Sequence, residues 1–157
     1  MDATTMPSTP SLLPKVIADF PEVTFIAGEE FLWSPSNKTV FYVESEPHSP
    51  LLLHELAHGL LDHHEYDKDI ELVAIENKAW EKAREIGTQY GVSIDEDLIQ
   101  DHLDTYREWL HARSTCPSCE ATGFQTGKEA YRCVACLHEW RVNEARLCGL
   151  KRYSLTK

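Results

Sequence analysis

Two histidines and a glutamate in the stretch His54-Glu55-Leu56-Ala57-His58 have the residue types and the spacing of a zinc site. Residues four apart in a helix project from the same face, so His54 and His58 could close on one ion with Glu55 beside them. An active-site zinc takes three protein ligands and leaves a position for water, whose pKa falls from about 15.7 to about 7. A carboxylate at Glu55 would accept the proton from that water. The pattern therefore predicts hydrolysis of a peptide bond, with Glu55 as the catalytic base.

The residues around this motif predict the helix that must position it. Ser49 supplies an oxygen that can cap a helix start, and Pro50 has the backbone angle of a first helical position. Apolar residues then recur at helical spacing and give the helix a face to bury. These residues are Leu53, Ala57, Leu60 and Leu61.

Four cysteines near the C-terminus predict a second metal site. Cys116 and Cys119 form one C-x-x-C pair, Cys133 and Cys136 form another, and thirteen residues separate the pairs. This is the spacing of a zinc ribbon, in which two short hairpins supply four thiolates to one ion. Four cysteine ligands leave no position for water, so this zinc would be structural. Redox-active pairs are the alternative, and the remaining Cys148 receives no role.

Composition and charge set limits on the function. The chain has 157 residues, 42% of them hydrophobic, and a formal charge of −11. Residues 1–113 hold 8 Lys/Arg and 22 Asp/Glu, whereas residues 114–157 hold 7 and 4, a balance of +3. No apolar run approaches the roughly 20 residues of a membrane span, and the N-terminus lacks a secretion signal. We therefore expect a cytoplasmic protein whose contacts with nucleic acid, if any, involve the C-terminal part.

The N-terminal part predicts a flexible lead-in followed by a small sheet. Residues 1–14 are too poor in large apolar groups to order themselves, and Lys15 onward could form a helical turn. Residues 22–26, 30–33 and 39–43 are rich in β-branched and aromatic side chains and predict an antiparallel sheet. The last of these is a candidate edge strand that receives an extended substrate beside the metal. Alternatively, it only covers the core.

Two more helices should follow the histidine helix. One runs from Asp69 to Ile86 and ends at Gly87 or Gly91. The next starts at a capping box formed by Ser93 with residue 96 and continues toward residue 113. Its apolar positions are Ile99, Leu103, Tyr106 and Leu110. The predicted fold is α+β, with a small antiparallel sheet and three helices in a domain over residues 15–113, and a zinc ribbon with a tail over residues 114–157.

A third ligand for the histidine site must come from residues beyond its helix. On a helical wheel, Glu76 falls inside the apolar sector that Leu72, Ile75, Ala79 and Ala83 define. A carboxylate there would be costly to bury unless a metal compensates its charge. Glu71 falls outside that sector and is predicted to be solvated. The full set of candidates is His63, His64, Asp67, Glu71 and Glu76.

The histidine pair, followed about eighteen residues later by Glu76 in a setting that continues to Ala83, resembles the ImmA/IrrE family of metallopeptidases. The resemblance covers roughly residues 39–87. It implies a zincin-like core and a thermolysin-like zinc site of His54, His58 and Glu76, with Glu55 as base and a protein as substrate. Lys78 stands where that family frequently has an acidic residue, and no helix-turn-helix segment accompanies the motif.

Two other functions remain open. With His63 as third ligand, the motif resembles the SprT-like proteases that act on proteins crosslinked to DNA, although its spacing matches theirs loosely. A non-catalytic adaptor that keeps zinc for stability is the other alternative. In each case the ribbon is expected to select a protein partner or substrate, with contact to nucleic acid less favoured. The groups that could make such contact are Arg132, Arg141, Arg146, Lys151 and Arg152, near Trp140 and Tyr131.

Overall fold

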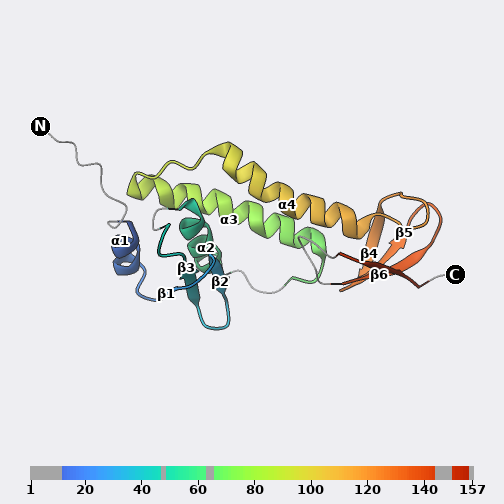
Figure 1. Cartoon of the computed structure of the whole chain (residues 1–157), viewed down its shortest axis with the longest axis horizontal. Helices are drawn as coiled ribbons and strands as arrows, with labels where there is room; N and C mark the ends of the chain where they lie inside the picture. The colour runs from blue at the N-terminus through green and yellow to red at the C-terminus, as the bar shows by residue number, and fades with distance from the viewer. Residues whose placement is uncertain (1–11, 47–48, 63–65, 144–149, 156–157) are drawn as a thin grey trace, which may run out of the picture. The chain divides into compact units, whose positions relative to one another are not determined.

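The computed structural model describes residues 12–46, 49–62, 66–143 and 150–155 (Figure 1). The chain divides into two compact units, Met1–His64 with Lys78–Asp95, and Glu65–Asn77 with Glu96–Lys157. Helix α3, Asp69–Tyr90, contributes residues to both units. Each unit has a sheet and helical segments, so the predicted α+β class is confirmed.

The sheet of the first unit is mixed, and not antiparallel as predicted. It contains β1 (Thr24–Ala27), β2 (Leu32–Ser34) and β3 (Thr39–Tyr42) in the order β1-β3-β2. Strand β2 pairs with β3 in antiparallel fashion, whereas β1 pairs with β3 in parallel. Strand β2 lies on the far side of β3 from β1 and runs in the opposite direction to both. The chain reverses once between β1 and β2 and again between β2 and β3, so β1 and β3 run in the same direction.

The prediction that residues 39–43 form an edge strand is wrong, because β3 lies between β1 and β2. Successive residues of a strand point to opposite faces of the sheet. Thr39 and Val40 expose only 4% and 0% of their surface, so both faces of β3 are covered where the strand begins. A strand that is covered on both sides suits the centre of a sheet, and the edges of the described sheet are β1 and β2.

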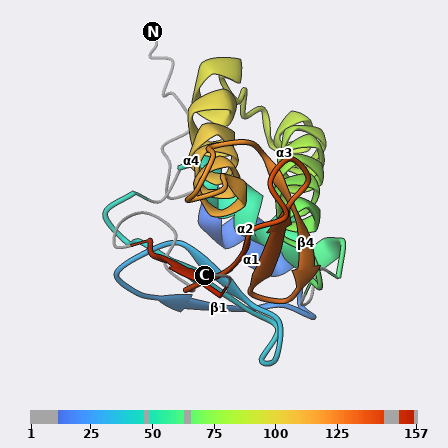
Figure 2. The same ribbon diagram turned by 90° about the vertical axis from the view of Figure 1, so that its right-hand side faces the viewer.

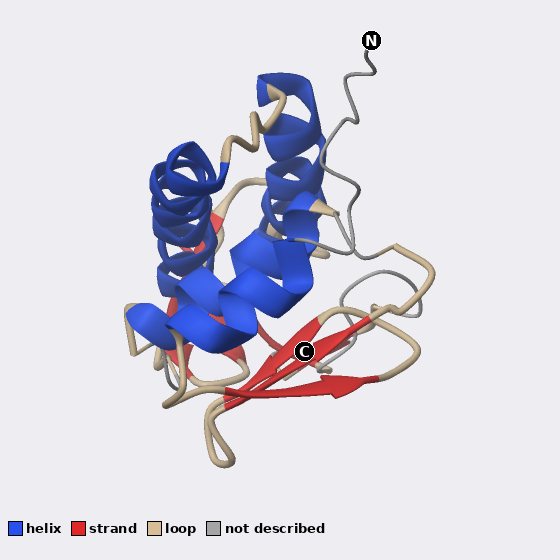
Figure 3. Ribbon diagram, turned by 90° about the vertical axis from the view of Figure 1, so that its left-hand side faces the viewer, coloured by secondary structure: helices blue, strands red, loops and turns tan. Residues whose placement is uncertain are grey.

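Helix α2, Pro50–Leu60, packs against strands β2 and β3, as Figure 3 shows with helices in blue and strands in red. The predicted α3 is confirmed and extends to Tyr90. Gly91 has a φ of +70°, and the N–H of Val92 donates to the carbonyl of Gly87, so Gly91 ends the helix. A fourth helix, α1 (Leu12–Asp19), was predicted only as a short turn from Lys15.

The second unit combines α4, Glu96–Ser114, with an antiparallel four-stranded sheet (Figure 2). Helix α4 starts at Glu96, two residues later than a cap at Ser93 predicts. The sheet carries the four cysteines on and beside its strands, and the hairpin of β4 and β5 lies between the two cysteine pairs. In order, its strands are β4 (Gly123–Gly127), β5 (Ala130–Cys133), β6 (Glu139–Val142) and β7 (Arg152–Ser154).

Within the second unit, a buried ion pair joins the start of α3 to the end of α4, and two aromatic side chains of the sheet bind the same residues. Arg113 Nε donates to Asp69 Oδ2 at 2.7 Å, and both side chains are at most 4% exposed. The Tyr131 hydroxyl donates to the same carboxylate oxygen at 2.5 Å. Burial raises the pKa of this hydroxyl and Asp69 raises it further, so it stays protonated as a donor. Trp140 Nε1 donates to the carbonyl of Arg113 at 2.9 Å.

Two aromatic residues of this sheet lie inside the second unit. Tyr131 and Trp140 expose 3% and 0% of their surface and stack on each other in the core of the second unit. They therefore stabilise the sheet from its core. Across the described residues, none of the helices has the length and apolar character needed to cross a membrane.

Candidate metal centres

Helix α2 begins as its sequence predicts. The Ser49 hydroxyl oxygen accepts a hydrogen bond from the N–H of Leu51 at 3.2 Å, and Pro50 occupies the first helical position. Leu53 and Ala57 are fully buried, as predicted, whereas Leu61 is 38% exposed in the turn after the helix. The helix thus presents a buried face, and His54 and His58 lie on it.

His54 and His58 are placed as two ligands of one ion would be. Their Nε2 atoms are 3.2 Å apart, and their rings meet edge to face with centroids 4.7 Å apart. Two nitrogens held about 2.0–2.1 Å from a tetrahedral zinc would be separated by about 3.3 Å. The observed distance fits a shared zinc ion, and donor atoms of His54, Glu55 and His58 all lie within 4.8 Å of one another.

Two tryptophans of the first unit pack against α2. The Trp80 ring stacks on His54 with centroids 4.1 Å apart and an interplanar angle of 28°. Trp33 lies against α2 at Gly59, where an added Cβ would be 2.8 Å from the Trp33 ring. Only a glycine at position 59 therefore allows Trp33 of β2 to pack this close to α2. His54 and His58 are 0% and 7% exposed, whereas Glu55 is half-buried, so the carboxylate is the most accessible of the three groups.

Glu76 lies in the buried stripe of α3 that the helical wheel predicts. It is 5% exposed, between Leu72 at 8% and Ala79 at 0%. Glu71 is exposed, and its carboxylate accepts a hydrogen bond from the N–H of Asp67 at 3.2 Å, so it stabilises the start of the helix. Whether Glu76 binds metal stays a prediction. Imidazoles and carboxylates are both ligands that zinc takes, so the histidine pair and Glu76 each offer donors that could hold a metal ion.

His102 was not among the ligands that the sequence predicted. Within the second unit, donor atoms of Glu76 and His102 lie within 4.8 Å of each other. His102 is half-buried on α4, three residues after Ile99 and four before Tyr106, both of which the apolar pattern included. A helical wheel for α4 could have found it, as the wheel for α3 found Glu76. His63 and His64, the remaining histidine candidates, lie outside the described residues, and Asp67 is exposed.

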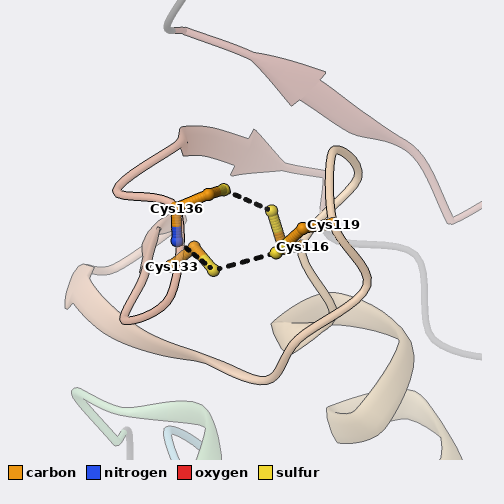
Figure 4. A group of neighbouring side chains, drawn as sticks. All are labelled: Cys116, Cys119, Cys133 and Cys136. Carbon is orange, nitrogen blue, oxygen red and sulfur yellow. Dashed lines mark hydrogen bonds between the residues drawn. The ribbon is translucent and has the colours of Figure 1, made fainter.

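The four cysteines of the second unit converge on one point (Figure 4). Cys116 Sγ lies 3.7 Å from Cys136 Sγ, and Cys119 Sγ lies 3.5 Å from Cys133 Sγ. Four sulfurs held about 2.3 Å from a tetrahedral zinc would be separated by about 3.8 Å, whereas a disulfide needs about 2.05 Å. The arrangement thus fits a four-cysteine zinc site and does not contain disulfides. Cys148 lies outside the described residues.

Backbone donors help the cysteine site to hold a thiolate. The N–H of Cys136 and that of Ala135 point at Cys133 Sγ from 3.5 and 3.3 Å. They lower the pKa of Cys133 to about 6. The N–H of Ala121 lowers the pKa of Cys119, but the contacts of its thiol with the other three cysteines outweigh this effect and raise the pKa to about 12. A metal ion that binds cysteine takes it as the thiolate, so metal binding at this cluster would release protons.

Comparisons of the chain with protein-family models, with curated proteins and with solved structures find no match. The chain's function is therefore argued from its two candidate metal-binding groups, the histidine and glutamate group and the four-cysteine cluster.

Proposed function

We propose that the chain is a zinc-dependent metalloendopeptidase, in which His54, His58 and Glu76 hold the ion and the second unit selects the protein substrate or partner. The observation that carries this proposal is the 3.2 Å separation of the two Nε2 atoms on α2, with Glu55 next to His54 in the same helix. A zinc ion held there would supply Lewis-acid catalysis and acidify a water molecule.

Helix α3 supports Glu76 as the third ligand. Glu76 and Trp80 lie one turn apart on α3, so their side chains project from the same face. Trp80 stacks directly on His54, which brings that face of the helix to the histidine pair. A buried carboxylate is costly without compensation, and a cation would supply it. His102, near Glu76, would hold the orientation of that carboxylate or serve as an alternative ligand.

Glu55 has the position of a general base. It is half-buried beside two nearly fully buried histidines, so its carboxylate can reach a water molecule at the metal site while the histidines are shielded. A base in this position would accept a proton as the water attacks the scissile carbonyl and would deliver it to the leaving amine. The structure holds Glu55 on a regular helix, which fixes its position relative to His54 and His58.

The test compares the unmodified chain with Glu55→Gln. Fluorescently labelled casein serves as substrate, and zinc content is measured on the same samples. We expect cleavage to fall by at least about a hundredfold, as the loss of a general base typically does, while zinc content is unchanged. Glu81→Gln, an exposed position on α3, is the matched control and should leave both unchanged. If Glu55→Gln retains full cleavage, the peptidase proposal fails, and if neither protein cleaves while zinc is bound, the adaptor function is favoured.

A further inference from the structure

A pocket of about 350 Å³ lies beside strand β4, entirely within the second unit. The first turn of α3 contributes Ile70, the end of α4 contributes Leu110, and β4 contributes Phe124. This volume is at the low end of the roughly 300–1,000 Å³ of ligand pockets, so it suits one or two side chains better than a large cofactor.

Three polar side chains in the wall of the pocket, those of Gln125, Tyr131 and Ser114, are already used within the protein. Gln125 Oε1 accepts from the N–H of Asp69 at 2.6 Å, and Gln125 Nε2 donates to the carbonyl of Lys128 at 2.9 Å. Tyr131 donates to Asp69, and Ser114 Oγ donates to the carbonyl of Leu110 at 2.8 Å. A group that enters the pocket would gain little from hydrogen bonding there, so the pocket favours an apolar group.

Two large apolar side chains at the pocket are left in solvent. Ile70 is 65% exposed and Phe124 is 47% exposed. The other aromatic residue of the pocket, Tyr131, is buried and held by the ion pair of Asp69 and Arg113. The pocket therefore has a rigid floor and an apolar rim, as the buried centre of a protein interface has.

Lysines flank the apolar rim. A smaller pocket of about 220 Å³ shares Lys68 and Gln125 with the first pocket and adds Lys128. Both lysines are exposed, and one carboxylate, that of Asp67, also lines this smaller pocket. With two cations to one anion in an otherwise acidic chain, this edge of the pocket favours a partner that carries negative charge.

We infer that this pocket binds a segment of a partner protein that places one large apolar side chain between Ile70 and Phe124 and an acidic residue against Lys68 and Lys128. The inference names the recognition site of the second unit and to that extent rests on the proposed function. A nucleic acid would need polar contacts to its bases, and the polar atoms of Gln125, Ser114 and Tyr131 are engaged within the protein, so a peptide fits the pocket better.

The experiment measures binding without cleavage. The full chain carrying Glu55→Gln is titrated against a fluorescein-labelled peptide with one Phe between Asp residues, and binding is followed by fluorescence anisotropy. Two further peptides replace the Phe by Ser or the Asp residues by Lys. We expect the first peptide to bind and each change to weaken binding by about tenfold or more, the loss that follows when a buried side chain or a close charge pair at an interface is removed.

Variants of the protein locate the binding site. Phe124→Ser and Ile70→Ser should each weaken binding of the Phe peptide by about tenfold or more. Lys68→Glu combined with Lys128→Glu should weaken it and should reduce its dependence on salt. The matched controls are Leu155→Ser and Lys151→Glu, which change exposed residues of the same unit that do not line the pocket and should leave affinity unchanged. Far-UV circular dichroism and thermal melts verify that each variant is folded.

The inference is overturned if the Phe peptide does not bind, if the Ser peptide binds equally well, or if the controls weaken binding as much as Phe124→Ser. It is also overturned if labelled oligo(dT) binds and displaces the Phe peptide in a manner sensitive to Phe124→Ser, which would assign the pocket to nucleic acid. Binding without casein cleavage by the unmodified chain would reject the peptidase and keep the docking site. Casein cleavage by the unmodified chain, without binding of the Phe peptide, would keep the peptidase proposal and reject the docking site.

Discussion

The four cysteines of the second unit come from two short turns, whereas His54 and His58 come from a single helix of the first unit. The cysteine cluster supplies four donors, and its sulfur separations of 3.5 and 3.7 Å are close to those of a filled tetrahedral site. The helix supplies two imidazoles and leaves the remaining positions to other residues or to water. The two centres thus differ in the number of protein ligands. A zinc ion with four protein ligands has no open position, whereas one with fewer can bind water or substrate and take part in chemistry.

The two centres also differ in how their side chains are buried. Cys116 and Cys133 are buried and Cys119 and Cys136 are exposed, so each pair has one ligand in the core of the second unit and one at its surface. In α2 both histidines are buried and only Glu55 is half-exposed. Protein stability is expected to depend on the cysteine cluster, and activity on the histidine centre. The predictions below test this contrast.

The largest effect is expected at the cysteine cluster. Cys119→Ser should release one zinc ion and make residues 114–157 sensitive to protease, since a structural zinc of this kind contributes about 10–16 kcal/mol of apparent binding energy. Zinc analysis and limited proteolysis measure both effects. Ser118→Ala, at an exposed position between the same two cysteines, should change neither. Loss of both zinc ions in Cys119→Ser would show that the two centres are not independent.

The next largest effect is expected at Glu76. Glu76→Gln should reduce casein cleavage by more than about a hundredfold and weaken zinc binding at the histidine centre, because changing even a residue that contacts a metal ligand costs 10–100-fold. Glu71→Gln should have little effect, since Glu71 is exposed and binds the backbone of Asp67. His63→Ala is measured beside them. If His63→Ala loses the metal while Glu76→Gln keeps it, the third ligand is His63 and the resemblance to ImmA/IrrE peptidases fails.

A smaller effect, on stability alone, is expected at the buried ion pair. Arg113→Met leaves the Asp69 carboxylate buried without its cation and should lower the free energy of unfolding by about 3–5 kcal/mol, as the loss of one partner of a buried pair does. Urea denaturation measures the change. The double variant Arg113→Met with Asp69→Asn should recover part of the loss, because the uncompensated charge is gone. A loss below about 1 kcal/mol in the single variant would contradict the buried pair.

The smallest effect is expected at the start of α2. Ser49→Ala removes the oxygen that accepts the N–H of Leu51 and should lower the free energy of unfolding by about 1 kcal/mol. Ser45→Ala, an exposed position before the helix, is the control and should have no effect. Because this cap stabilises only the helix with the histidines, zinc at the cysteine cluster should be retained in both variants. A shift of 3 kcal/mol or more would mean that Ser49 does more than cap the helix.

The sequence predicted the parts of each candidate centre that depend on near neighbours. The start of α2 at Ser49 and Pro50, the convergence of the four cysteines and the burial of Glu76 all follow from local spacing, and each is confirmed. The position of β3 was not predictable in this way. Strands pair with segments distant in the chain, and β1 runs parallel to β3 even though the strand that follows it, β2, is antiparallel to β3.

Several features were decided by tertiary structure alone. Tyr131 and Trp140 are of residue types that are common in binding surfaces. Both lie in the core, where their rings stack on each other and Tyr131 binds the Asp69 carboxylate. Ile70 and Phe124 are far apart in sequence and line one pocket. His102, on α4, comes close to Glu76 on α3. The sequence by itself determined which metal-binding side chains exist and how far apart they lie within α2 or within each C-x-x-C pair, because the spacing along a short segment follows from its local backbone geometry. Only the folded chain decided which of those groups are buried, paired or left in solvent, because that depends on packing between segments that no local pattern specifies.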